Sequence, residues 1–241
     1  MSPENTALTQ QTATQALLNR PAHIQAGAEG RDHLKAEDIK MPRLVLAQSQ
    51  HTDPDNSAYQ AGVKVGDFFN DLTGQVYEQP INFSIVRADP PRWIEFNPRD
   101  QGGGVKEMNI RPGDPRTLFK DGKPPVATQF YDYVIVMWPS REFIAVSYKS
   151  TAISATARPL NGLVAQRGTD IHTGRYQMTS FADKNKKGSF RSAAIINHPT
   201  DPWLNEEEAQ FTKAAFAALK LDKRATDAFE RGTVEEDHAE E

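Results

Sequence analysis

The sequence predicts a mainly β protein with peripheral helices, an α+β arrangement. Residues 81–87 (INFSIVR) alternate between apolar and polar side chains, which predicts a half-buried strand. Residues 129–138 and 143–148 are rich in β-branched and aromatic side chains and are joined by a four-residue turn, so they predict a hairpin at the centre of the sheet. Apolar residues at helical spacing occur late in the chain, within residues 150–168 and after Asn205.

Other segments add strands and one long loop. Residues 41–47 predict a first strand, and residues 65–70 and 75–77 predict a short hairpin whose Gly74 supplies the positive φ of the turn. Residues 92–96 are expected to be extended, and residues 175–181 and 190–197 predict a second hairpin around a polar loop, residues 183–189. Residues 97–125 contain many prolines and glycines, and loops of this length are usually functional or mobile.

Two helices complete the predicted elements. In residues 150–168, Pro159 shortens or kinks the helix and Gly168 ends it. Asn205 and the three glutamates after it form a helix start, because the amide caps free backbone N–H groups and acids favour the positive end of the helix dipole. The predicted organisation is a disordered arm (residues 1–35), a β domain (36–200), a helix packed on it (201–228) and a disordered acidic tail (229–241).

Composition and charge restrict the function classes. The absence of cysteine excludes disulfides, thiol catalysis and Cys-containing zinc sites, and it favours a cytoplasmic location. No apolar run reaches the roughly 18–20 residues of a membrane span, so no membrane partner is expected. The net charge of −4 is unevenly distributed, because residues 141–200 hold nine basic and three acidic residues whereas residues 231–241 hold five acidic residues and one arginine.

Motifs of catalysis and cofactor binding are absent from the sequence. No GxSxG, HExxH, GxxxxGK[ST] or EF-hand pattern occurs, and the six histidines are scattered singly. The three glycines 102–104 lack a strand-to-helix context and predict a flexible loop, and Asp53-Pro54-Asp55-Asn56 is what an ordinary turn requires. We therefore expect no enzyme, no metal and no cofactor, although a nuclease whose carboxylates meet only in the fold stays open as an alternative.

Aromatic rings next to cations supply the positive signal. Such pairs are Arg92-Trp93, Tyr148-Lys149, Arg175-Tyr176 and Phe190-Arg191. Cations neutralise phosphates, and rings stack on unpaired bases for about 1–3 kcal/mol each. The alternative for each pair is a core ring beside a solvated cation. The predicted contacts are the rings Trp93, Tyr148 and Tyr176 and the cations Arg92, Lys149, Arg158, Arg175, Lys184, Lys186, Lys187 and Arg191.

Five stretches carry a family resemblance: residues 38–46 (DIKMPRLVL), residues 66–76 (GDFFNDLTGQV), Trp93 with glycines 102–104, residues 148–151 (YKST), and residues 176–180 (YQMTS) with the Lys-rich turn. Over about residues 38–196 the sequence resembles a family of bacteriophage single-stranded DNA-binding proteins. The resemblance implies an OB-like, partly open β-barrel with added hairpins, an inserted helix and a C-terminal helix. It also implies an acidic C-terminal tail, which here lacks the terminal aromatic that some phage binders use to dock partners.

The expected function is sequence-tolerant binding of single-stranded DNA in phage DNA replication or recombination, in the host bacterial cytoplasm. The tail acids can contact replication or recombination proteins, compete with DNA for a basic groove, or serve only solubility; they are Glu235, Glu236, Asp237, Glu240 and Glu241. Two alternatives stay open, a strand-annealing recombination protein that forms rings and a non-enzymatic phage structural or host-interaction protein. Assembly into a homo-oligomer stays open as well.

Overall fold

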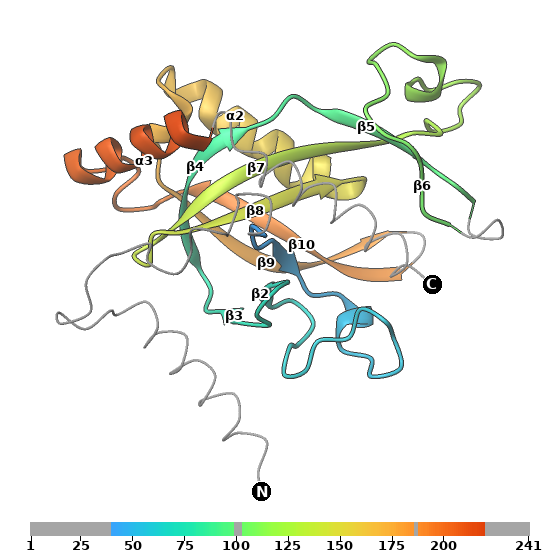
Figure 1. Cartoon of the computed structure of the whole chain (residues 1–241), viewed down its shortest axis with the longest axis horizontal. Coiled ribbons are helices and arrows are strands. Elements are labelled where there is room, and N and C mark those ends of the chain that lie inside the picture. Colours follow the sequence, from blue (N-terminus) through green and yellow to red (C-terminus); the bar gives the residue numbers. More distant parts are fainter. Residues whose placement is uncertain (1–39, 99–102, 186–187, 220–241) are drawn as a thin grey trace, which may run out of the picture.

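A strongly curved seven-stranded sheet forms the body of the molecule, and a three-stranded sheet lies against it (Figure 1). The computed structural model describes residues 40–98, 103–185 and 188–219. The predicted arm (residues 1–35) and the acidic tail (residues 229–241) lie outside the described residues. The strands are β1 (Leu44–Leu46), β2 (Phe68–Asn70), β3 (Val76–Tyr77), β4 (Ile81–Ala88), β5 (Arg92–Phe96), β6 (Val105–Glu107), β7 (Thr128–Trp138), β8 (Glu142–Lys149), β9 (Tyr176–Asn185) and β10 (Gly188–Asn197).

Strand β7 is the centre of the large sheet. The strand order is β10-β9-β4-β7-β5-β6, and β8 pairs with the other edge of β7. The β7–β8 hairpin was predicted to lie at the centre of the sheet. Of its two strands, only β7 is central. Strand β8 is an edge strand of the large sheet. Its far side meets the small sheet, where the backbone N–H of Ala145 donates to the carbonyl of Pro42 at 2.9 Å.

The two edges of the large sheet are bridged by the segment around β1. On the β8 side, Arg43 forms an isolated bridge with Ala145. On the β10 side, the Gln48 side chain accepts a hydrogen bond from the backbone N–H of Arg191 at 2.8 Å and donates to its carbonyl at 2.9 Å. The sheets are not closed, and the fold is the partly open β-barrel with helices that the sequence analysis expected.

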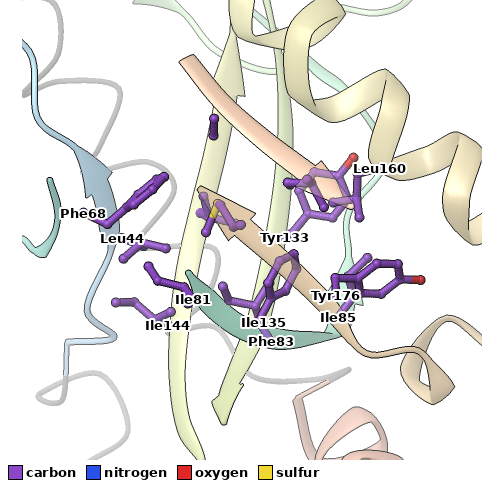
Figure 2. Packing of buried hydrophobic residues seen from close by; sticks show 14 of the residues in the cluster. Leu44, Phe68, Ile81, Phe83, Ile85, Tyr133, Ile135, Ile144, Leu160 and Tyr176 are labelled. Carbon is purple, nitrogen blue, oxygen red and sulfur yellow. The ribbon is translucent and has the colours of Figure 1, made fainter. Parts of the chain in front are cut away.

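The barrel interior is filled with apolar side chains, so it offers no channel. Figure 2 shows Phe83, Ile85, Tyr133, Ile135 and Tyr176 packed together between the strands. Alternate residues of β4 and β7 supply this cluster, because successive side chains of a strand point to opposite faces. These side chains form the main hydrophobic core of the described residues.

Two helices cover the barrel at different places. A π-helical segment (Ile153–Ala157) leads into α2 (Arg158–Arg167), and its Thr156 hydroxyl donates to the carbonyl of Ala193 on β10 at 2.6 Å. Helix α2 ends where Gly168 takes a left-handed φ of 62°, as predicted. No helix among residues 40–98, 103–185 and 188–219 is long and apolar enough to cross a membrane.

Helix α3 (Glu206–Leu219) packs on the outer face of the barrel. Its Phe211, Phe216 and Leu219 meet the outward side chains of β4 and β7, Val86 and Val134 among them. The strand predicted over residues 81–87 is consequently buried on both faces, and the expectation of a half-buried strand is wrong for that reason.

The β9–β10 hairpin is longer than predicted. The ladder continues to the pairs Lys184 with Ser189 and Asn185 with Gly188, so most of the predicted polar loop 183–189 is strand. Hydrogen bonding across the strands favours this extension, since the Ser192 hydroxyl donates to the Asp183 carboxylate at 3.3 Å. Beyond Met178 the hairpin no longer pairs with β4. The side chains of Gln79 and Gln48 still bond the backbones of Ser180 and Arg191, and the part beyond them projects from the barrel.

Candidate nucleic-acid interface

Two of the three predicted stacking rings lie in the barrel core, so their assignment as base-stacking residues is wrong. Tyr148 is 6% exposed and Tyr176 is 0% exposed. The Tyr176 ring lies 5.5 Å from that of Phe83, and the Tyr148 ring lies 5.9 Å from that of Tyr133. Burial raises the pKa of both phenols. These rings stabilise the fold and cannot meet a base.

The sequence did contain the signal for this burial. Tyr148 has the same strand parity as Ile144 and Val146, and Tyr176 has the same parity as Met178. Residues that alternate in this way share one face of a strand, and here that face is the barrel interior. A charged neighbour in sequence, such as Lys149 beside Tyr148, points to the opposite face and says nothing about the ring.

Trp93 is the predicted ring that remains partly exposed. It lies on β5 opposite Gln129 of β7, and its carbonyl accepts a hydrogen bond from Ile110 at 2.9 Å. The cation beside it, Arg92, faces the other way and is paired with the buried carboxylate of Asp132. The Arg92 guanidinium also lies 5.0 Å from the centre of the Phe130 ring. Arg92 therefore has a structural role, and its assignment as a phosphate contact is wrong.

Arg175 is also committed to the fold. Its guanidinium bridges the carboxylates of Asp201 and Glu208, and the side chain is 14% exposed. The bridge joins the start of β9 to the first turn of α3. Arg175, a predicted phosphate contact, is thus held in two ion pairs, because acids that lie 26 and 33 residues away in the sequence lie beside it in the fold.

The other predicted cations lie on three elements. Arg158 is exposed at the first position of α2, and Lys149 is partly exposed at the end of β8, opposite Phe130. Lys184 is exposed and Arg191 partly exposed on the β9–β10 hairpin. Lys186 and Lys187 lie outside the described residues. The hairpin is the one element that carries more than one of these described and accessible cations.

Lys184 and Arg191 share one face of the hairpin. Lys184 pairs with Ser189 and Arg191 with Ala182, so the two cations are diagonal neighbours, and such neighbours lie about 7–8 Å apart in sheets. The other residues on this face of the projecting part are Ser180 and small or apolar residues, none of them acidic. The face therefore presents two cations and no acid of its own two strands, and the Arg191 side chain lies beside Gly66, just before β2.

Two rings that sequence analysis did not assign lie on the opposite face of the same hairpin. Phe181 is exposed and Phe190 partly exposed, and they are diagonal neighbours in the register. The single acid of this face among the described residues, Asp183, accepts from the backbone N–H of Lys184 at 2.7 Å and from the Ser192 hydroxyl. The hairpin thus has a cationic face and an aromatic face.

Another cation missed by the sequence analysis, Arg167, lies beside the root of this hairpin. Its guanidinium is sandwiched between the rings of Tyr176 and Trp203, at 4.7 Å from each ring centre. It also donates to the Asn197 side chain at 2.7 Å. Arg167 therefore fixes the base of β9 and β10 and leaves one exposed ring, Trp203, at the surface.

The candidate metal ligands do not gather in the described part of the chain. Residues 40–98, 103–185 and 188–219 contain no group of three or more His, Asp or Glu side chains that could hold an ion. Asp53 lies in a turn, where its carboxylate accepts from the backbone N–H of Asp55 at 3.1 Å. The turn expected from the sequence of residues 53–56 is confirmed.

These features define a class: a partly open β-barrel protein with a filled interior and a projecting hairpin that is cationic on one face. A family model described as Pam3 phage gp34-like protein matches residues 12–223, and the chain belongs to this bacteriophage protein family. No curated protein and no solved structure matches the chain.

Proposed function

We propose that this protein binds single-stranded DNA without strong sequence preference, in phage DNA replication or recombination. The supporting observation is the cationic face of the β9–β10 hairpin, where Lys184 and Arg191 lie side by side and neither strand places an acid on that face. The match to a phage family supports the phage context of the proposal, and the sequence resemblance supports DNA binding.

The chemistry of this surface suits an unpaired strand. Lysine and arginine neutralise backbone phosphates and release counterions, which gives affinity independent of base sequence. Phe181 and Phe190 lie on the other face of the same hairpin. A DNA single strand that wraps around the hairpin would place its phosphates against the cations and its bases against these rings. Double-stranded DNA cannot offer its base faces to these rings, and single strands are therefore preferred.

Fluorescence titration of the full chain with oligo-dT and with a duplex of equal length, at two salt concentrations, tests the proposal. We expect tighter binding of oligo-dT and weakening with salt, by about 0.7 in log K per log salt for each phosphate contact. Equal affinity for duplex, or binding that ignores salt, would contradict it.

A matched pair of variants locates the contact. Lys184→Ala with Arg191→Ala removes both hairpin cations, whereas Lys213→Ala removes an exposed lysine of α3 on the other side of the barrel. The double variant should lower the salt slope by about 1.4, two contacts at the single-strand value, and the α3 variant should keep the wild-type slope. Equal slopes for all three proteins would remove the hairpin from the interface.

A further inference from the structure

Exposed apolar side chains gather in two segments that the DNA-binding proposal does not use. Of the nine exposed large hydrophobic residues in the described ranges, six lie in these segments. One segment is the lobe formed by residues 108–127, and the other is the unit formed by residues 48–78 around the small sheet. The six residues are Leu118, Phe119 and Val126 in the lobe and Tyr59, Val65 and Leu72 in the unit.

The lobe presents its apolar tip among positive charges. Phe119 is 77% exposed and Val126 is 67% exposed, higher fractions than any other large hydrophobic residue described. Lys120 and Lys123 flank a tight turn, in which each donates a backbone hydrogen bond to the other's carbonyl. Residues 108–127 contain four basic and two acidic residues, so the lobe carries a net charge of +2.

The lobe is held in one conformation by a charged anchor below its tip. Arg116 donates to Asp114 at 2.9 Å, to Glu95 at 2.8 Å and to Glu107 at 2.6 Å. The Arg116 contacts lower the pKa of Asp114 to about 2, and hydrogen bonds from Lys106 and Arg116 hold the pKa of Glu95 below its ordinary value. A pre-organised surface loses less conformational entropy when it binds a partner.

The 48–78 unit has the opposite charge. It contains five acidic residues and one lysine, a net charge of −4 with histidine neutral. Asp53 and Asp55 are exposed in the turn that precedes Tyr59. Figure 1 shows the unit at the lower edge of the molecule and the lobe at the upper edge, with the barrel between them.

We propose that the lobe of one copy docks on the 48–78 unit of a second copy. Each segment exposes three large hydrophobic residues, and the net charges of the two segments are opposite, so each complements the other in charge but does not complement a second copy of itself. Because the two surfaces lie at opposite edges of one chain, the contact is head-to-tail. Such heterologous contacts build rings or open filaments and not closed two-fold dimers.

Sedimentation velocity of the full chain tests this contact without DNA. The wild-type mass should rise above 26.8 kDa with protein concentration, and added salt should reduce it. The lobe variant is Phe119→Asp with Lys120→Glu, and the unit variant is Asp55→Lys with Leu72→Lys. The control, Ile196→Asp with Lys213→Glu, changes an exposed hydrophobic residue and an exposed lysine outside both surfaces. Circular dichroism melts confirm that each variant folds.

A head-to-tail contact makes a distinctive prediction for mixtures. The lobe variant keeps an intact unit and the unit variant keeps an intact lobe, so each alone should stay monomeric and a mixture should form 1:1 dimers and nothing larger. The control should assemble like the wild type. A wild-type protein that stays monomeric at all concentrations overturns the proposal, and so does a unit variant that dimerises alone, which would indicate a lobe-to-lobe contact.

Discussion

The two long hairpins of this protein contain similar residues and do different things with them. Strands β7 and β8 are covered by the barrel core on one face, and α3 covers their outer face next to Val134 and Val136. Strands β9 and β10 share this environment only at their root, up to Met178. Tyr148 on β8 and Tyr176 at the root of β9 are therefore buried in the core, whereas Lys184 further along β9 is exposed.

Residue type alone therefore did not locate the interface. Tyr148-Lys149 and Phe190-Arg191 are both ring–cation pairs in sequence, yet the first ring is in the core and the second is at the surface of a projecting arm. The two rings differ in burial because the strands that carry them are covered by different numbers of layers. Three changes would break or sharpen this distinction.

The largest effect should come from truncating rings at the root and at the projecting part of β9. Tyr176→Ala removes a fully buried ring and should lower the free energy of unfolding by about 3–5 kcal/mol. Phe181→Ala, five residues along the same strand, should cost less than about 1 kcal/mol because its ring is exposed. Urea denaturation of both variants measures the difference, and equal losses would show that the projecting part is as well packed as the root.

A smaller loss of stability is expected at the contact between Gln48 and β10, the seam that ties the β9–β10 hairpin to the small sheet. Gln48→Ala removes both hydrogen bonds to the backbone of Arg191 and should cost about 1–3 kcal/mol in unfolding free energy. Gln210→Ala is the control, since that side chain bonds only Glu206 on the exposed surface of α3. Amide exchange at Arg191 should accelerate in the first variant alone. Unchanged exchange there would mean that β10 does not depend on the seam.

The smallest effect should be the response of the 108–127 lobe to acid. The folded pKa values of Glu95 and Asp114 are lowered, so their contribution to stability is complete above the ordinary values of 4.5 and 3.8 and is lost as the pH falls toward the lowered ones. Wild-type lobe amides should therefore stay ordered near pH 4 and change between about pH 4 and 2. In Arg116→Gln the change that follows Asp114 should move up to near its ordinary value of 3.8, whereas Lys106 still holds the pKa of Glu95 below 4.5. NMR titration of the Ala127 amide, which donates to the Arg116 carbonyl, follows this. Identical titration in both proteins would rule out the anchor.

Much of the fold was predictable because strands and helix ends are encoded locally. Alternation located β4, and β-branched and aromatic composition located the β7–β8 hairpin. Asn205 does cap α3, with its side chain accepting from the Glu208 N–H at 2.9 Å. The site was less predictable because its key contacts are distant in sequence. The residues next to Arg175 in the sequence do not indicate its ion pairs with Asp201 and Glu208. The residues next to Val86 do not indicate the helix that buries it. Strand parity was the local signal from which the burial of Tyr148 and Tyr176 could have been predicted.

Hydrogen–deuterium exchange with and without oligo-dT tests the central claim most directly, because it compares the two hairpins in one sample. The account predicts added protection over residues 180–191, around Lys184 and Arg191, and no change over residues 134–146 of β7 and β8. Protection confined to other segments, or none at saturating oligo-dT, would contradict the assignment of the projecting hairpin as the DNA-binding surface.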